Sequence, residues 1–297
     1  MRIGLGTVQF GADYGISNTL GKVSGQQVSA ILQEASLAGI SVLDTASLYG
    51  DSETVLGDYI PFHSDFKIVS KTLVCKLSSV DDSYIAAVET TVHSSLQNLR
   101  IDKIYGLLIH HARDVFKPGG EKIVALLKKL KSQGLVQKIG VSIYDGDELD
   151  RVLEEFTPDL VQLPVNLLDQ RLLASGHIAK LKALGVEIHT RSLFLQGALL
   201  IESTDLPAYF EPVRHKFEAV SKFSEMHNLC PMTTCILFGL LQRDIDVLLI
   251  GVTSVDELMQ IIEAVKTIDS QARPDFRDLA LNEPQYVNPA NWPTTKA

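Results

Sequence analysis

The sequence predicts a single-domain (β/α)8 TIM barrel, and three observations lead to this prediction. Eight short runs rich in β-branched and apolar residues recur along the 297 residues. Most of the segments between these runs carry the apolar spacing of three and four residues that amphipathic helices show. Strands that alternate with helices form a parallel sheet through right-handed crossovers, and eight such units fit a chain of this length as one closed barrel.

The eight predicted strands are apolar along most of their length, as strands covered on both faces are. They span residues 2–8, 41–44, 66–71, 104–110, 136–142, 159–163, 186–191 and 246–252. An open, doubly wound sheet is the alternative fold. This alternative is weaker because no G-x-G-x-x-G motif follows the first run, where Gly4-x-Gly6 leads into Thr7-Val8-Gln9 instead.

The predicted helices carry start and stop signals at their ends. Ser24-x-x-Gln27 precedes the first amphipathic segment and Ser254-x-x-Glu257 precedes the last, and both have the form of a capping box. Glycines stand where three helices should end, namely Gly39, Gly134 and Gly185. The clearest helical periods are Ile85, Val88, Val92, Leu96 and Leu99, and Val255, Leu258, Ile262 and Val265.

Two segments depart from the alternation of strands and helices. A loop insertion near residues 197–213 separates the seventh strand from its helices. From about residue 268 the chain is polar and proline-bearing, without a clear helical or strand period. We expect residues 1–297 to form one domain, with this C-terminal tail lying over the barrel surface.

Composition excludes several classes of function. The formal net charge is −9, and an acidic surface disfavours nucleic acid and anionic membranes as partners. No apolar leader opens the sequence, and no apolar run reaches the length of a membrane span. Three irregularly spaced cysteines, Cys75, Cys230 and Cys235, predict reduced thiols in a cytoplasmic protein rather than a zinc site.

Polar side chains stand at the ends of three consecutive predicted strands. Asp44 ends the second, Lys71 the third and His110 the fourth, and Tyr49 lies in the loop after Asp44. In a barrel of this type the carboxyl ends of the strands converge on one mouth. Each residue alone has a structural explanation, as a helix cap, a solvated strand end or a core edge. Together they place an acid, an ammonium, a phenol and an imidazole at one face, whereas we expect His111 to be exposed or to face a helix.

These residues and their spacing resemble the aldo-keto reductase family. The matching motifs are Gly4-Leu5-Gly6-Thr7, Asp44-Thr45-Ala46-x-x-Tyr49-Gly50-x-Ser52-Glu53, Lys71, His110, Gly140-Val141-Ser142, Gln162-x-x-x-Asn166, Ser192-x-x-x-x-Gly197 and Gly251-Val252-Thr253-Ser254. The resemblance covers nearly the whole chain. It implies NAD(P)H-dependent reduction of an aldehyde, ketone or sugar carbonyl, or the reverse alcohol oxidation, with a small molecule as substrate.

The chemistry of carbonyl reduction suits the four strand-end residues. Hydride addition builds negative charge on the carbonyl oxygen, which requires a proton donor within hydrogen-bond reach. Tyrosine has a pKa of about 10, and a nearby ammonium lowers the pKa of a phenol. We therefore expect Tyr49 to be the general acid, Lys71 the ammonium beside it, and Asp44 the counter-ion that keeps Lys71 charged. His110 would donate a hydrogen bond that orients the carbonyl oxygen.

The resemblance also implies a site for NADP(H) or NAD(H). Ser142 and Gln162 would hold the nicotinamide carboxamide, and Arg191 falls where many family members stack an aromatic ring on the nicotinamide. A planar guanidinium can stack in the same way. The other implied cofactor residues are Thr7, Asp44, Ser192, Leu193, Gln196, Gly251, Thr253, Glu257 and Gln260. For Glu257 a capping box with Ser254 is the structural alternative.

Several positions differ from the family pattern. Ile143 stands where Asn is common, and Gln260-Ile261 replaces a Glu-Asn pair near the adenine. Residues 198–213 and 251–263 contain no Lys or Arg, although both segments hold acids. We therefore expect a weak or absent preference for NADPH over NADH, unless Arg214 or Lys216 reaches the cofactor.

Other functions stay open from the sequence alone. Lys71 is also suited to a Schiff-base mechanism in an aldolase-like barrel, and a cofactor-binding module without turnover is a third possibility. The substrate pocket is expected to involve residues 13–20, residues 197–213 and the region of Trp292, which is equally suited to pinning the tail. The segment Gly11-x-x-Tyr14-Gly15-Ile16 is similar to bacterial reductases associated with surface-sugar metabolism. The sequence specifies no oligomeric state.

Overall fold

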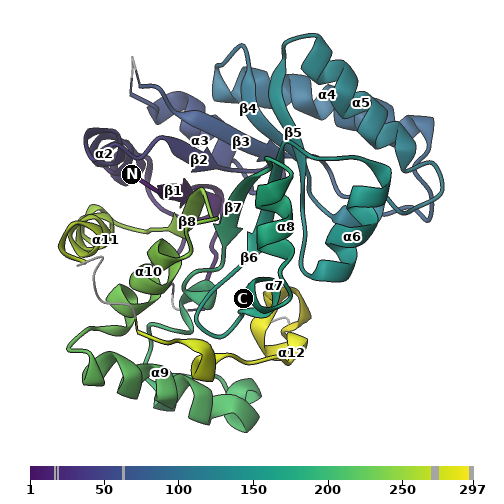
Figure 1. The fold of residues 1–297 in the computed structure, drawn as a ribbon. Coiled ribbons are helices and arrows are strands. Elements are labelled where there is room, and N and C mark those ends of the chain that lie inside the picture. The colour runs from purple at the N-terminus through teal and green to yellow at the C-terminus, as the bar shows by residue number, and fades with distance from the viewer. Residues whose placement is uncertain (17, 19, 62–63, 269–273, 294–297) are drawn as a thin grey trace.

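The computed structural model describes residues 1–16, 18, 20–61, 64–268 and 274–293, in which eight parallel strands form a closed barrel (Figure 1). The strands are β1 (Ile3–Gly6), β2 (Val42–Asp44), β3 (Lys67–Lys71), β4 (Ile104–Ile109), β5 (Val136–Ser142), β6 (Leu160–Pro164), β7 (Glu187–Arg191) and β8 (Val247–Gly251). Each strand pairs with its neighbours in chain order, and β1 pairs with β8 to close the ring. The (β/α)8 prediction is confirmed, and the open-sheet alternative is wrong because its two edge strands pair with each other here.

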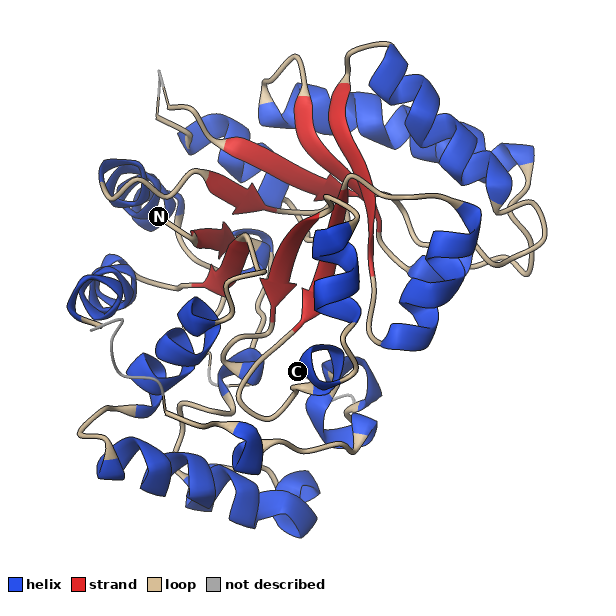
Figure 2. Cartoon of the chain, in the orientation of Figure 1, coloured by secondary structure: helices blue, strands red, loops and turns tan. Residues whose placement is uncertain are grey.

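Helices follow the strands and cover the outside of the barrel (Figure 2). The α-helices are α1 (Val8–Gly11), α2 (Gly25–Leu37), α3 (Ser52–Tyr59), α4 (Asp82–Leu99), α5 (Glu121–Ser132), α6 (Gly146–Glu155), α7 (Arg171–Ala174), α8 (His177–Ala183), α9 (Arg214–Met226), α10 (Pro231–Leu241), α11 (Val255–Thr267) and α12 (Pro284–Val287). Short 3-10 turns are η1 (Ala112–Asp114), η2 (Leu195–Gly197), η3 (Ser203–Asp205), η4 (Ala208–Val213), η5 (Arg277–Leu279) and η6 (Pro289–Asn291). None of the helices in the described ranges combines the length and apolar character needed to cross a bilayer.

The predicted element ends are close to those observed. All eight predicted strands are present, and the main difference is Val8, which begins α1 because the N–H of Phe10 turns back to the Thr7 carbonyl at 2.9 Å. The hydroxyls of Ser24 and Ser254 accept the backbone N–H three residues on, which is the predicted cap at the start of α2 and α11. The three predicted stop glycines all have positive φ, namely Gly39, Gly134 and Gly185.

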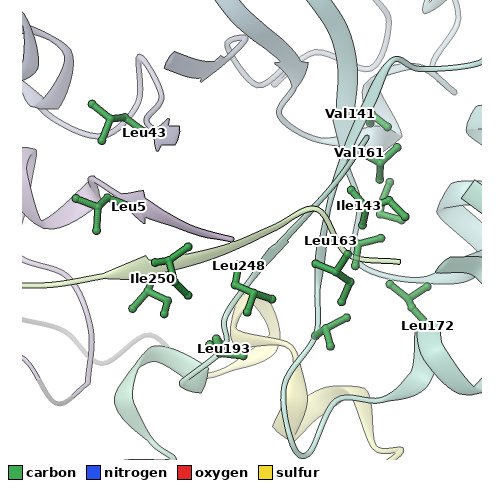
Figure 3. Packing of buried hydrophobic residues seen from close by; sticks show 14 of the residues in the cluster. Leu5, Leu43, Val141, Ile143, Val161, Leu163, Leu172, Leu193, Leu248 and Ile250 are labelled. Atoms are coloured by element: carbon green, nitrogen blue, oxygen red, sulfur yellow. The ribbon is translucent and has the colours of Figure 1, made fainter. Parts of the chain in front are cut away.

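Strand side chains alternate between two apolar cores. Residues that point into the barrel form a small inner core, which consists of Val42, Val69, Leu108, Leu160, Val247 and Leu249. Their neighbours along the strands point outward and pack against the helices, as Leu5, Leu43, Val161 and Leu248 do (Figure 3). Burying one such side chain contributes about 1.5–3 kcal/mol, so the two cores together hold the strand ends in fixed positions.

A polar network, here called the Glu187 network, fills the barrel near the amino ends of the strands. Glu187 accepts hydrogen bonds from the Tyr105 hydroxyl at 2.7 Å and pairs with Lys138 and with the buried His189. Burial opposes ionisation of Glu187, but its hydrogen bonds to His189, Lys138 and Tyr105 lower its pKa to about 2. The network therefore carries a stable carboxylate at the end of the barrel opposite the mouth.

The insertion and the tail pack on each other. The insertion at residues 197–213 folds into η3 and η4 before α9. The indole N–H of Trp292 donates to the Tyr286 carbonyl at 3.0 Å, and its ring lies edge-on against Phe210 of η4, with centroids 5.0 Å apart. The tail has more local structure than its sequence predicted, with η5, α12 and η6, although residues 269–273 and 294–297 lie outside the described part.

Candidate active site

A cavity of about 760 Å³ lies at the carboxyl ends of the strands, and every predicted site residue lines it. The last residues of six strands take part directly, at Gly6, Asp44, Lys71, Ser142, Arg191 and Gly251. The other predicted residues on its wall are Thr7, Tyr49, His110, Gln162, Ser192, Leu193, Gln196, Thr253, Glu257 and Gln260. The closed ring therefore brings together side chains that lie up to about 250 positions apart in the sequence.

Asp44 and Lys71 form a buried ion pair beneath this cavity. The Lys71 ammonium lies 2.8 Å from both carboxylate oxygens of Asp44 and donates a third bond to the Thr45 carbonyl at 2.9 Å. Burial alone would lower the pKa of Lys71, but the charge of Asp44 and the nearby Tyr49 outweigh it, and the pKa of Lys71 is raised. Lys71 is therefore a charged ammonium with all three N–H groups engaged.

Tyr49 is held above Lys71 by a close approach of two loops. The Lys71 Nζ lies 4.9 Å from the centre of the Tyr49 ring. Gly50 has a φ of 58°, and a Cβ there would lie 2.2 Å from the Gly11 carbonyl oxygen, so only glycine fits at this contact. The buried Ser52 hydroxyl ties the same turn to Thr7. These contacts fix the tyrosine beside the ammonium.

His110 follows β4 and is neutral. Burial, helped by the charges of Lys71 and others, lowers the pKa of His110 to about 3. Its backbone N–H bonds to the Thr72 hydroxyl at 3.3 Å, and its ring lies edge-on to Tyr49 with centroids 6.0 Å apart. The buried Nδ1 has no partner among the described residues. His111 is exposed, as expected.

Gln162 connects the predicted cofactor-binding residues to the predicted catalytic residues. It pairs with Ser142 in the β5–β6 ladder, and both side chains lie on the cavity wall. Its side-chain N–H donates to Asp44 Oδ1 at 2.7 Å, a contact that the sequence did not predict. The side-chain carbonyl of Gln162 is the group left to accept a hydrogen bond from a ligand.

The loop after β7 lines the cavity and contains backbone N–H groups without a partner among the described residues. Ser192, Leu195 and Gln196 have φ values of 63°, 49° and 54°, a rare left-handed conformation for side-chain-bearing residues. The backbone N–H groups of Ser192, Leu193 and Gln196 have no acceptor within the described ranges. Successive backbone N–H groups in a loop, as at Ser192 and Leu193, can bind an anion. The loop therefore suits the pyrophosphate of a dinucleotide.

The neighbouring part of the cavity wall, after β8, carries acid rather than base. Glu257 accepts bonds from the Thr253 N–H at 2.7 Å and from its hydroxyl at 3.0 Å, so it serves the predicted cap. Gln260 is exposed on the wall, whereas Ile261 is buried in the core. The two candidate cations lie elsewhere: Arg214 pairs with Glu211, and Lys216 donates to the Asp278 carbonyl.

Several wall residues had not been assigned a role. Tyr144 lines the cavity, and strand alternation could have indicated it because it is two residues beyond Ser142. Tyr14 accepts a bond from the Gln196 amide at 2.8 Å, which joins the loop after β1 to the loop after β7. The start of α10 also contributes, without any indication in the sequence, through Cys230, Pro231 and Met232. Pro289 and Ala290 line the cavity from the tail near Trp292, a region that the sequence had indicated. Trp292 is not among the lining residues, so it pins the tail.

Comparison with known proteins finds similar dehydrogenases and reductases. The chain is 25% identical to L-galactose dehydrogenase of Arabidopsis thaliana over 89% of this chain and 85% of that protein. It is 27% identical to an NADH-specific methylglyoxal reductase of Escherichia coli strain K12 over 67% of this chain and 65% of that protein. The holo form of an aldo-keto reductase from Bacillus halodurans has the same fold, with a TM-score of 0.73 at 17% identity, over 94% and 92% of the two chains.

A family model links these relatives to the geometry of the cavity. The model of the aldo/keto reductase family matches residues 2–275, which include all eight strands and every residue of the predicted site. The enzymes of this family are NAD(P)-dependent oxidoreductases, and carbonyl reduction is their common chemistry. With the barrel, the cavity and the match in agreement, the chain belongs to the aldo/keto reductase family.

Proposed function

We propose that Tyr49 is the general acid of a carbonyl reduction, with Lys71 and Asp44 behind it. The bound cofactor supplies the hydride. As negative charge develops on the carbonyl oxygen, the Tyr49 hydroxyl donates its proton to that oxygen. In the reverse direction the phenolate accepts the proton of the alcohol. The observation that carries this proposal is the charged Lys71, 4.9 Å from the ring of the one tyrosine that follows Asp44 in the β2 loop.

The buried ion pair supports the role given to Lys71. An ammonium beside a phenol stabilises the phenolate that remains after proton transfer. Asp44 offsets the cost of burying that ammonium, since both of its oxygens lie 2.8 Å from Nζ. The charge on Lys71 is thus available at the site throughout the physiological pH range.

His110 is proposed to orient the carbonyl oxygen. A neutral imidazole carries one N–H, and the depressed pKa of His110 keeps the ring neutral at pH 7. It donates a hydrogen bond without competing with Tyr49 as an acid. Its position next to the Tyr49 ring lets both groups reach the same substrate oxygen.

The cofactor is proposed to lie across the cavity between the β7 loop and the start of α11. Ser142 and the Gln162 carbonyl would hold the carboxamide, and the unpaired N–H groups of Ser192, Leu193 and Gln196 would donate to the pyrophosphate. Thr7, Arg191, Gly251, Thr253 and Gln260 form the remaining walls. Glu257 would act through Thr253, because both of its oxygens are already engaged there.

We further propose that NADH serves at least as well as NADPH. The wall around Gly251–Gln260 carries Glu257 and, within the described residues, no cation that would bind a 2′-phosphate. Arg214 and Lys216 are engaged away from the cavity. The NADH-specific relative from Escherichia coli is consistent with this preference.

The geometry of Lys71 disfavours the Schiff-base mechanism. A nucleophilic lysine must be neutral, and its pKa is lowered in enzymes that use it so. In this chain the pKa of Lys71 is raised, and its three N–H groups point at Asp44 and Thr45.

Thermal-shift titration with NADH and NADPH, followed by an aldehyde and sugar panel, tests the proposal. We expect both cofactors to raise the melting temperature, and cofactor-dependent turnover of at least one carbonyl. Tyr49→Phe should keep the thermal shift and lose the turnover. Turnover that persists in Tyr49→Phe would assign the proton transfer to another group.

A further inference from the structure

Arg191 is an arginine on the cavity wall that has no acidic partner in the described part of the chain. It ends β7, and its Nη2 donates to the Ile143 carbonyl at 3.0 Å, just beyond β5. The centre of its guanidinium lies 4.2 Å from the centre of the Tyr144 ring. The side chain therefore extends from β7 across β6 to the end of β5. In the ring of strands this position is next to β4, which His110 follows.

The two acids on the cavity wall are committed to other partners. Asp44 accepts bonds from Lys71 and Gln162, and Glu257 accepts two bonds from Thr253. No ion pair of Arg191 exists among the described residues. Its remaining N–H groups have no protein acceptor there and are not enclosed, so they are open to the cavity.

The stacked guanidinium is a preorganised binding group. Tyr144 covers one face of it and Ile143 fixes one corner, so little side-chain freedom remains to be lost when a ligand binds. The edge that is left carries N–H donors in the fork geometry that fits two oxygens of one anion. Because Asp44 neutralises Lys71, Arg191 is, among the described residues that line the cavity, the cation without an acidic partner.

We propose that Arg191 binds a carboxylate on the carbonyl substrate, so that the enzyme prefers oxo acids or sugar acids to neutral carbonyl compounds of the same shape. The proposal rests on the proposed function, since it places the substrate carbonyl between Tyr49 and His110. A single arginine matches the single charge of a carboxylate better than the charge of about −2 that a phosphate carries.

Paired substrates that differ only in charge test this role. We would compare 4-carboxybenzaldehyde with 4-formylbenzamide, and glucuronate with glucuronamide, at saturating NADH. For wild type the ratio of kcat/KM, acid over amide, should be about 10 or more in at least one pair, the scale of one charge-assisted hydrogen bond. Arg191→Gln should bring that ratio to about 1, and Arg191→Lys should keep part of it. Because both substrates of a pair are measured with the same variant at saturating NADH, any effect of the substitution on cofactor binding is the same for both and cancels in the ratio.

A binding measurement separates this inference from the catalytic proposal. Calorimetric titration of the NADH-loaded protein with benzoate and with benzamide requires no turnover. Wild type and Tyr49→Phe should both bind benzoate more tightly than benzamide by about 10-fold, and Arg191→Gln should bind the two alike. An acid-over-amide ratio that Arg191→Gln leaves unchanged, or equal binding of benzoate and benzamide by wild type, would overturn the role of Arg191. If wild type turned over no carbonyl compound but still bound benzoate more tightly than benzamide, only the catalytic proposal would be refuted.

Discussion

The side-chain amide of Gln162 donates a hydrogen bond to Oδ1 of Asp44 at 2.7 Å, inside the barrel. The same oxygen lies 2.8 Å from the Lys71 ammonium. Gln162 comes from β6 and Asp44 from β2, on the far side of the ring. The predicted nicotinamide contact is thus linked through one carboxylate to the ammonium beside Tyr49.

The hydrogen bond predicts that substitutions at Gln162 and Asp44 have non-additive effects on the free energy of unfolding. Gln162→Met removes the donor to Asp44 and should lower the free energy of unfolding by about 1.5–3 kcal/mol, the usual worth of a hydrogen bond to a charged group. In an Asp44→Asn background the same change should cost at least about 1 kcal/mol less. Urea unfolding of the four proteins of this double-mutant cycle measures the difference. Additive effects would show that Gln162 acts independently of Asp44.

Tyr49→Phe should lower kcat by roughly two or more powers of ten, the scale of a general acid. It removes one hydroxyl and leaves the ring that packs beside His110, so the affinity for NADH should stay nearly unchanged. Steady-state kinetics and cofactor fluorescence titration measure the two quantities. Retention of more than about a third of kcat, with chemistry rate-limiting, would mean that Tyr49 is not the acid.

Lys71→Met should abolish activity and change the pH–rate profile of any residual turnover. The phenol of Tyr49 loses its neighbouring positive charge, and Asp44 is left as a buried carboxylate without its ammonium. Removing one partner of a buried pair costs about 3–5 kcal/mol of folding free energy. Circular dichroism and urea unfolding should show a folded but less stable protein. A pH–rate profile identical to that of wild type would contradict the coupling of Lys71 to Tyr49.

The ratio of kcat/KM for NADPH over NADH should be near or below one at fixed ionic strength. Gln260→Arg places a cation on the acidic wall after β8 and should raise this ratio by about 10-fold or more, since a charge-assisted bond contributes about 1.5–3 kcal/mol. Gln260→Met is the control of similar length without charge. A wild-type preference for NADPH beyond about 100-fold would require a phosphate contact outside the wall described here.

His110 should make the stability of the fold sensitive to acid. Its pKa is lowered from 6.5 to about 3, first by burial. Between these values the unfolded chain binds a proton that the folded chain does not, so stability is lost as the pH falls through this window. The unfolding free energy of wild type minus that of His110→Asn should therefore drop from pH 7 to pH 4, by up to about 1.4 kcal/mol per unit. A constant difference would show that His110 is not kept neutral by the fold.

The sequence predicted the barrel and the position of each strand-end residue because both depend on local patterns. Apolar runs and caps are set by neighbouring residues, and the mouth of a parallel barrel follows from strand direction alone. Thus Asp44, Lys71 and His110 could be assigned to one face before any contact was known.

Contacts across the barrel could not be predicted in this way. The bond from Gln162 to Asp44 and the stacking of Arg191 on Tyr144 depend on side-chain conformations and on the closure of the ring. The wall formed by Cys230 and Met232 depends on where α10 packs after the insertion. No periodicity or spacing in the sequence carries this information.

The Glu187 network has a consequence for how this enzyme can change. Its carboxylate and the residues paired with it lie at the amino ends of the strands, far from the loops that form the mouth. In barrels of this kind one end supplies stability and the other chemistry. Loops at the mouth can therefore diverge in length and composition, and acquire new substrates, without weakening the scaffold. A single substitution at Glu187, in contrast, leaves the buried His189 and the half-buried Lys138 without their carboxylate partner. Directed evolution of this chain should accept changes in the mouth loops outside the catalytic residues and the Gly11–Gly50 contact, and should reject changes at Glu187.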